Sequence, residues 1–130
     1  MVWHPSKYAE MLAEKMRIHG VDAWLINTGL TGGVHGIGTR MRLDYTRAII
    51  DAIHSGALDR IETVTDSVFG LEIPVSCPNV PSEILIPRDT WTDEADYDMA
   101  ASKLAGLFRD NFVQFEKGST EEVLQVAAAL

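Results

Sequence analysis

Glycines and arginines clustered between Trp24 and Ile53 are the residues whose types and spacing could support chemistry. The glycines come first and are Gly29, Gly32, Gly33, Gly36 and Gly38. A turn this rich in glycine lets backbone N–H groups approach a ligand closely, and a following helix adds its positive end. Arg40, Arg42 and Arg47 then place three guanidinium groups within eight residues. This arrangement is typical of nucleotide sites.

The flanking residues predict how such a loop is held. AWLIN, Ala23 to Asn27, is a short apolar run that predicts a strand covered on both faces, as in α/β sheets. The helix after the loop is expected to begin near Asp44 to Thr46 and to end at Gly56. Its buried positions are expected to be Ile49, Ile50 and Ile53. The loop alone also fits an ordinary strand-to-helix connection, with its arginines on a solvated face.

Ordered motifs extend beyond this loop. They are INTG at Ile26 to Gly29, TGG at Thr31 to Gly33, RM-x-L-x-x-TRAIIDAI from Arg40 to Ile53, and CPNVPSEIL followed by PRDTW up to Trp91. The helical tail ASKLAGLFRDNF, Ala101 to Phe112, follows them. Together these motifs closely resemble the C-terminal part of ATP-dependent phosphoenolpyruvate carboxykinase. The resemblance implies an α/β fold, with residues 1–130 as a single compact domain of mixed strands and helices, the C-terminal part of the carboxykinase nucleotide-binding domain.

The resemblance also implies an activity. Members of the family are decarboxylating lyases of gluconeogenesis, which convert oxaloacetate and ATP to phosphoenolpyruvate, ADP and carbon dioxide with the help of Mg and Mn. Their chains are several times longer, and the Walker A motif is absent here because no Gly-Lys-Ser or Gly-Lys-Thr occurs. The family's metal ligands and oxaloacetate-binding arginines lie in the part that is not present. We therefore expect a chain that is inactive alone and has the remainder of the enzyme chain as its partner.

One cluster of site residues can be carried over from the family. Its members border the adenine of ATP with an Arg-hydrophobic pair and a Thr, and the matching positions are Arg40, Met41 and Thr46. A guanidinium plane can stack on a purine, a thioether can fill the edge of the ring, and a hydroxyl can donate or accept. Two departures lie nearby, since many members have Trp at the position of Leu30 and a basic residue at that of Thr39. No catalytic residue is expected in this chain.

Composition limits the function classes independently. The chain has 130 residues, 46% of them hydrophobic, and a formal net charge of -8. This length and composition suit one soluble domain with a core. The acidic balance argues against binding to nucleic acid or to an anionic membrane surface. Since neither a long apolar run nor a signal-peptide pattern occurs, we expect a cytoplasmic protein.

Cysteine and histidine patterns indicate neither a disulfide nor a metal site. Cys77 is the only cysteine, and no basic residue stands close to it in the sequence to lower its pKa. The four histidines show no H-x-H or H-E-x-x-H spacing. We therefore expect no metal site within this chain and no catalytic thiol.

The remaining segments predict helices and short strands. A first helix opens at His4-Pro5-Ser6 and stops at Gly20. Glu62 to Val75 predicts one or two short strands, and the proline-rich stretch from Pro74 to Pro87 predicts a surface loop. Three apolar residues, Ile84, Leu85 and Ile86, are expected to pin that loop to the core.

Two helices are predicted in the last third of the chain. A long helix from about Asp93 to Phe115 carries core residues at three- and four-residue spacing, namely Tyr97, Ala101, Leu104, Phe108, Phe112 and Phe115. Ser119-x-x-Glu122 resembles a capping box for a last short helix.

Two functions stay open at this point. In the first, the chain is the adenine-side portion of a carboxykinase. In the second, it is a free-standing, non-catalytic nucleotide-binding or interaction module that shares the fold. A portion of a larger enzyme would keep an apolar face, which is expected on the first helix, with Met11 and Met16, and on the AWLIN strand. We therefore expect self-association at high protein concentration.

Overall fold

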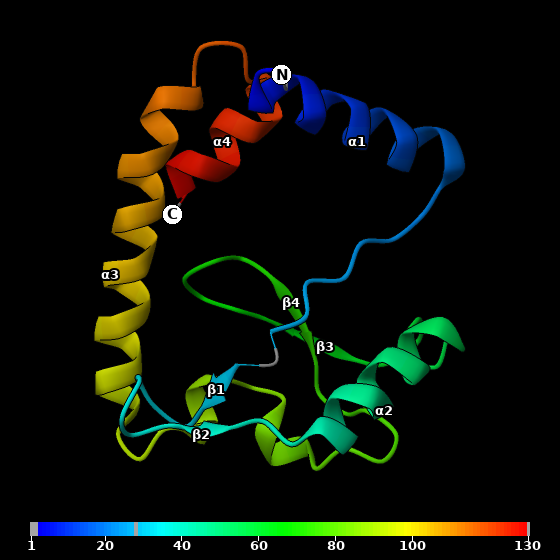
Figure 1. Cartoon of the computed structure of the whole chain (residues 1–130), viewed down its shortest axis with the longest axis vertical. Coiled ribbons are helices and arrows are strands. Elements are labelled where there is room, and N and C mark those ends of the chain that lie inside the picture. Colours follow the sequence, from blue (N-terminus) through cyan, green and yellow to red (C-terminus); the bar gives the residue numbers. More distant parts are fainter. Residues whose placement is uncertain (1–2, 28, 130) are drawn as a thin grey trace. The chain divides into compact units, whose positions relative to one another are not determined.

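Helices and short hairpins make up the chain in the computed structural model, which describes residues 3–27 and 29–129. The main elements are α1 (Pro5–His19), β1 (Leu30–Thr31), β2 (Thr39–Arg40), α2 (Leu43–His54), β3 (Thr63–Thr65), β4 (Glu72–Pro74), α3 (Glu94–Phe112) and α4 (Glu121–Ala129) (Figure 1). Three short 3-10 turns are η1 (Ser82–Ile84), η2 (Arg88–Thr90) and η3 (Val113–Phe115). This mixture of helices and small sheets confirms the α/β class.

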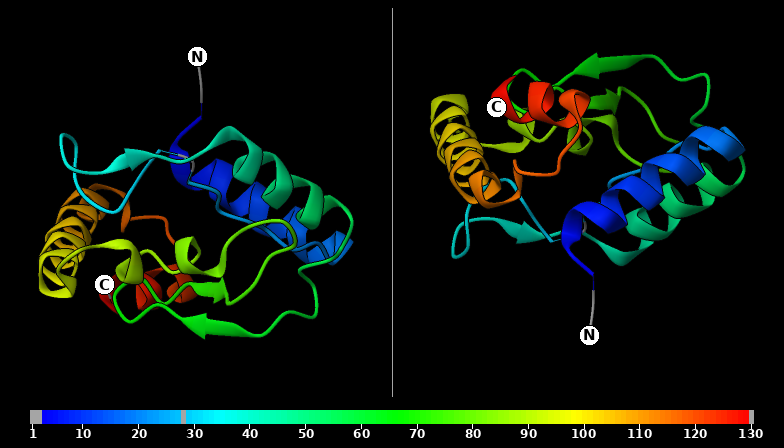
Figure 2. Two further views of the ribbon diagram at one scale, coloured as in Figure 1. Left: turned by 90° about the horizontal axis from the view of Figure 1, so that it is seen from below. Right: turned by 90° about the horizontal axis from the view of Figure 1, so that it is seen from above.

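Two compact units divide the chain. One is Asn27–Ala105, and the other combines Met1–Ile26 with Gly106–Leu130. Because the boundary falls within α3, this helix contributes residues to both units and runs unbroken through the boundary (Figures 1 and 2). The assignment of residues 1–130 to one carboxykinase domain stays a prediction.

The core of the Asn27–Ala105 unit lies against α2. Its buried cluster consists of Ala52, Leu58, Cys77 and Val80. Partly buried residues packed against it are Tyr45, Ala48, Ile49, Ile53, Ile61, Ile84 and Leu85. The helix is therefore confirmed in place and in its apolar face, although Ile50 lies outside that face and is 37% exposed. Gly56 follows the helix with a φ of 71°, as a left-handed residue at a helix end should.

The predicted short strands after Glu62 are confirmed as one antiparallel hairpin. β3 pairs with β4 in the register Thr63↔Pro74, Val64↔Ile73 and Thr65↔Glu72. The hydroxyls of Thr63 and Thr65 each donate to the Glu72 carboxylate at 2.6 Å. These two hydrogen bonds favour the ionised form and hold the pKa of Glu72 below its usual value.

The expected strand over AWLIN is wrong. Residues 21–27 have no regular secondary structure, and Leu25 is 85% exposed. An apolar run indicates that burial is favourable, but a strand also needs a neighbour that completes its hydrogen bonds. Pairing begins only after Gly29, where Leu30 meets Arg40.

Capping residues and glycine bound the helices of the unit that combines Met1–Ile26 with Gly106–Leu130. α1 begins at Pro5, where His4 Nδ1 accepts from the Ser6 amide at 3.4 Å, and its end at Gly20 has a left-handed φ of 57°. Both bounds confirm the sequence prediction. The Ser119 capping box is wrong, since Thr120 Oγ1 accepts from the Val123 amide at 3.5 Å. The Ser119 hydroxyl instead donates to the Phe115 carbonyl at 2.8 Å.

The long helix matches its predicted span, with its last turn tightened into η3. Ala101 is buried, and Tyr97, Phe112 and Phe115 are partly buried. Leu104 and Phe108 are 44% and 51% exposed, so their assignment to the core is wrong for this chain. Periodic spacing shows which face of a helix is apolar, but not whether a neighbour covers it.

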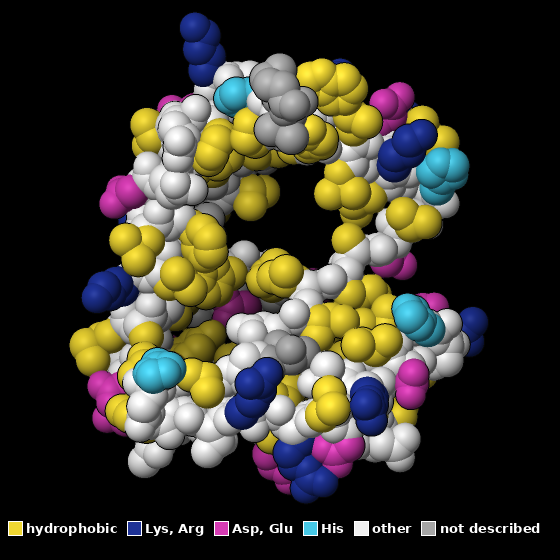
Figure 3. Space-filling model, in the orientation of Figure 1, with side chains coloured by type: hydrophobic (Ala, Val, Ile, Leu, Met, Phe, Trp, Pro, Cys, Tyr) yellow, Lys and Arg dark blue, Asp and Glu magenta, His cyan; other side chains and the backbone are white. Residues whose placement is uncertain are grey.

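The surface of α1 leads to a prediction of self-association. Leu12 is 62% exposed and Met11 38%, while Met16 is partly buried. Hydrophobic side chains lie on the surface over α1 (Figure 3). Exposed apolar patches favour association in water. We expect light scattering to show dimers or larger species whose share grows with protein concentration. Leu12→Lys should shift the distribution toward monomer, and a strict monomer at millimolar concentration would contradict the expectation.

Candidate nucleotide-binding site

The glycine-dense segment forms the loop of a β-hairpin. β1 pairs antiparallel with β2 in the register Leu30↔Arg40 and Thr31↔Thr39. At the open end of the hairpin, the Met41 amide donates to the Gly29 carbonyl at 3.0 Å. The segment therefore differs from the predicted order of strand, loop and helix, because a returning strand, β2, stands between the loop and α2.

Close backbone approach explains why glycine stands at the end of the loop. A Cβ on Gly38 would lie 2.4 Å from the Gly33 carbonyl oxygen and 3.0 Å from that of Thr31. Within the loop, the amides of Ile37 and Gly38 donate to the Val34 carbonyl at 3.0 and 2.9 Å. The loop is thus closed on itself and leads directly into the site residues.

Arg40 lies at the end of β2 with an exposed side chain, and within residues 3–27 and 29–129 it makes no ion pair. Arg42, in contrast, is engaged locally. Its Nε and Nη2 donate to the two Asp44 carboxylate oxygens at 3.0 and 2.6 Å. Its guanidinium also lies 4.8 Å from the centre of the Tyr45 ring. Of these two arginines, Arg40 is the one available to an added ligand.

The Arg42–Asp44 pair changes the protonation equilibria at the start of α2. Hydrogen bonds from Arg42 hold the pKa of Asp44 below its ordinary value, and Asp44 in turn raises the pKa of Arg42. Both groups stay charged near neutral pH and largely cancel each other. The Arg40 guanidinium has no such acidic partner in the part of the chain that the structure describes, so its charge is not offset in this way.

Met41 and Thr46 follow Arg40 in the chain. The Met41 side chain is partly buried and directly follows Arg40. Thr46 lies in the first turn of α2, where its hydroxyl donates to the Arg42 carbonyl at 3.4 Å. The oxygen of that hydroxyl can still accept a hydrogen bond from a ligand. The three predicted residues therefore lie in one continuous segment made of β2, its exit and the start of α2.

A second segment that sequence reasoning did not assign to the site reaches the hairpin. The Gly32 amide donates to Thr90 Oγ1 at 3.1 Å, and the Thr90 hydroxyl donates to the Pro87 carbonyl at 2.6 Å. Thr90 belongs to η2, within the PRDTW motif. That motif supported the family resemblance, but its sequence does not indicate which of its residues contacts the glycine loop.

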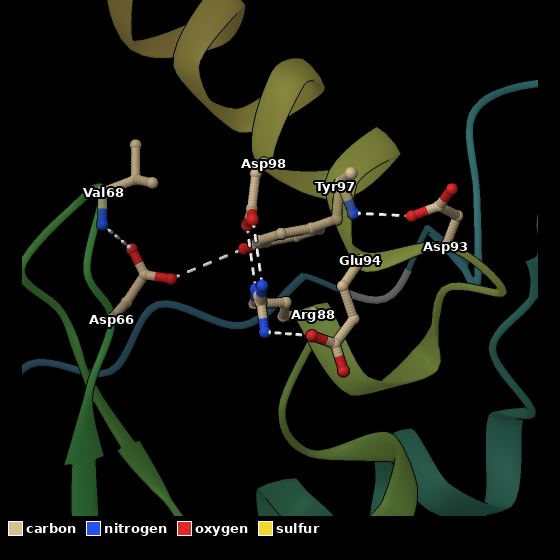
Figure 4. A network of polar contacts seen from close by, with 8 residues as sticks. Asp66, Val68, Arg88, Asp93, Glu94, Tyr97 and Asp98 are labelled. Carbon is tan, nitrogen blue, oxygen red and sulfur yellow. Dashed lines mark hydrogen bonds and ion pairs between the residues drawn. The ribbon is translucent and has the colours of Figure 1, made fainter.

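An ion-pair cluster holds η2 against the start of α3. Arg88 donates from Nε and Nη2 to the two Asp98 carboxylate oxygens at 2.8 and 2.9 Å, and from Nη1 to Glu94 (Figure 4). The bidentate geometry fixes direction as well as distance. It also holds the pKa of Asp98 below its usual value and raises the pKa of Arg88.

Tyr97 extends this cluster toward the β3–β4 hairpin. Its hydroxyl points toward Asp66 at 3.4 Å (Figure 4). The Tyr97 ring also packs edge-on against Trp91, with centroids 5.7 Å apart. Asp66 also accepts from the Val68 and Phe69 amides at 3.0 and 2.6 Å. Partial burial, followed by the nearby Asp66 charge, raises the pKa of Tyr97.

Residues 3–27 and 29–129 also contain acidic, histidine and cysteine side chains outside this segment. There, no group of three or more His, Cys, Asp and Glu residues is placed to hold a metal ion. None of the helices there combines the length and apolar character that crossing a bilayer requires. The Cys77 thiol is buried, and burial raises its pKa, which keeps it protonated at neutral pH.

Comparison with known proteins identifies the family. The sequence profile described as phosphoenolpyruvate carboxykinase, in its ATP-dependent form, matches residues 1–83. Phosphoenolpyruvate carboxykinase (ATP) 2 of Salinibacter ruber is 51% identical over 130 residues, which are 100% of this chain and 24% of the relative. The corresponding protein of Dictyostelium discoideum is 53% identical over 100% of this chain and 23% of its own length.

A third relative extends the agreement. Phosphoenolpyruvate carboxykinase (ATP) of Flavobacterium johnsoniae is 55% identical over 124 residues, 95% of this chain and 23% of its own length. The chain thus spans about a quarter of the length of these curated relatives. On the profile match and these identities, the chain belongs to the ATP-dependent phosphoenolpyruvate carboxykinase family.

Proposed function

We propose that this chain supplies the adenine-binding side of the nucleotide site in an ATP-dependent phosphoenolpyruvate carboxykinase. One observation carries the proposal: Arg40, which makes no ion pair within residues 3–27 and 29–129, shares one continuous segment with Met41 and Thr46, in a family named for its use of ATP. The enzyme converts oxaloacetate and ATP to phosphoenolpyruvate, ADP and carbon dioxide. Its place is gluconeogenesis in the cytoplasm, and residues 1–130 form part of its nucleotide-binding domain.

Each of the three residues has a distinct role in this proposal. The Arg40 guanidinium stacks on the adenine or donates to its ring nitrogens. Met41 packs against the edge of the ring, and the Thr46 hydroxyl accepts from the exocyclic amine. ATP is held only on its base side by these residues. The phosphate groups, the Mg and Mn ions and oxaloacetate are bound by the remainder of the enzyme chain.

A chimaeric enzyme tests the proposal directly. In it, this chain replaces the matching C-terminal quarter of the Salinibacter ruber relative, with which it aligns over all 130 residues. We expect ATP-dependent conversion of oxaloacetate by the chimaera and only background turnover by the chain alone. Phosphoryl transfer needs positioned phosphates and metal ions, and the chain alone does not hold them.

Coupled assays with oxaloacetate, ATP, Mg and Mn measure both proteins. The unmodified Salinibacter ruber enzyme is the positive control, and the same enzyme truncated before the exchanged region is the negative control. An inactive but folded chimaera would favour the free-standing binding module. Turnover by the chain alone that survives repurification would show that it carries its own phosphate and metal sites.

Thr46→Val tests the hydroxyl at the start of α2. The substitution keeps the side-chain shape and removes one acceptor, so we expect a rise in the KM for ATP of roughly five-fold, or about 1 kcal/mol. Thr46→Ser keeps the hydroxyl and should leave the KM close to that of the parent chimaera. Steady-state kinetics with ATP and GTP measure the effect, including any loss of discrimination between adenine and guanine. Equal KM values for all three proteins would remove Thr46 from the site.

A further inference from the structure

We propose that Thr90 is a positioning residue for the nucleotide site, acting as a latch that holds the β1–β2 hairpin against η2. The inference rests on the proposed function, in that the hairpin carries Arg40. It begins from one contact between segments far apart in the sequence. Thr90 Oγ1 accepts from the Gly32 amide at 3.1 Å and donates to the Pro87 carbonyl at 2.6 Å.

The contact is a close backbone approach as well as a hydrogen bond. A Cβ on Gly32 would lie 3.1 Å from the Thr90 carbonyl oxygen, and the φ of Gly32 is 77°. The loop therefore lies directly against η2 at this point. A side chain without an oxygen at position 90 would leave the Gly32 amide without its partner, which is costly at a partly buried position.

The latch is effective because η2 is itself held firmly. Arg88, two residues before Thr90, is fixed to Asp98 by two parallel hydrogen bonds and to Glu94 by a third (Figure 4). Both carboxylates belong to α3. The Thr90 hydroxyl thus binds the glycine loop to η2, and Arg88 binds η2 to the start of α3.

Arg40 is coupled to the latched loop through the hairpin. β1 and β2 share only two residue pairs, and one of them joins Leu30 to Arg40. A hairpin this short is only marginally stable by itself. Losing the contact at Gly32 should therefore let the loop and Arg40 move together, which weakens an oriented stack on a base more than it affects the chemical step.

The experiment compares three variants in the chimaera. Thr90→Val keeps the side-chain shape and removes the hydroxyl, whereas Thr90→Ser keeps the hydroxyl. Thr92→Val is the control, because it makes the same substitution at an exposed threonine nearby. Hydrogen exchange read by mass spectrometry on peptides covering residues 29–40 reports loop opening. We expect faster exchange in Thr90→Val only, together with a KM for ATP raised about five-fold and an unchanged kcat. Thr90→Ser should restore both values.

Three results would count against the latch. Unchanged exchange in Thr90→Val shows that the hydroxyl does not hold the loop. Faster exchange with an unchanged KM for ATP, while Arg40→Ala raises that KM, shows that the loop is latched without positioning Arg40. Loss of kcat together with a lowered melting temperature in Thr90→Val and Thr90→Ser alike shows a general packing role.

If neither Thr90→Val nor Arg40→Ala alters the KM for ATP, the proposed adenine site itself is wrong.

Discussion

Replacing Gly38 with alanine is expected to disrupt the β1–β2 hairpin and to abolish ATP-dependent turnover by the chimaera. The added Cβ would lie 2.4 Å from the Gly33 carbonyl oxygen and 3.0 Å from the Thr31 carbonyl oxygen. Both neighbours are backbone atoms that cannot swing away as a flexible side chain would. Overpacking of this kind costs up to ~3 kcal/mol, which is enough to open so short a hairpin.

Urea unfolding and steady-state kinetics measure the two parts of this expectation. Gly106→Ala is the matched control, because the nearest atom to its new Cβ is the end of the Arg109 side chain at 3.9 Å, and the residue lies inside α3. Alanine favours a helix interior by about 1 kcal/mol over glycine, so the control should be neutral or stabilising. A Gly38→Ala chimaera with parental stability and KM for ATP would refute the close approach.

Arg40→Ala is expected to raise the KM for ATP about ten-fold and to leave the KM for oxaloacetate unchanged. The substitution removes both a stacking plane and directed hydrogen-bond donors, a loss of ~1–2 kcal/mol. The effect should fall on the nucleotide because the proposal places Arg40 beside the base. Kinetics of the chimaera with each substrate varied separately give both constants.

Arg40→Lys separates the planar guanidinium from its charge, and Arg60→Ala is the control for the change of net charge. Arg40→Lys keeps the charge and loses the plane, so it should restore little of the affinity. Arg60→Ala makes the same change of net charge at another exposed arginine of the Asn27–Ala105 unit and should have no effect. If Arg40→Ala keeps the parental KM for ATP while folded, Arg40 is a solvated surface charge.

Local signals in the sequence predicted the helices well. His4-Pro5 and Gly20 bound α1, and Gly56 follows the end of α2, because caps and glycine ends depend on residues within one turn. One or two short strands over Glu62 to Val75 were predicted for the same reason, since β-branched residues stand around Gly70, whereas their pairing into a hairpin was not predicted. The candidate residues Arg40, Met41 and Thr46 came from motif resemblance, and their role in binding stays a proposal.

Contacts between distant segments could not be predicted in the same way. The Gly32–Thr90 hydrogen bond joins residues 58 positions apart, and neither residue type indicates that the two residues are in contact. The strand predicted over AWLIN was wrong because the apolar character of a segment does not show whether another strand pairs with it. Arg40 and Arg42 are the same residue type, yet among the residues that the structure describes only Arg42 pairs with an acidic residue and lies over an aromatic ring.

The register of the β1–β2 hairpin is set by its two residue pairs and not by the length of its loop. Side chains alternate between the two faces of a strand, so a slip of one residue in the pairing would exchange the faces taken by Thr39 and Arg40. Residues 32–38 lie outside the paired positions, so the loop can take up an insertion without such a slip. Relatives that keep this use of Arg40 should therefore vary more freely in the length and composition of the loop than at the paired positions, a difference that alignments of the family can examine without any biochemistry.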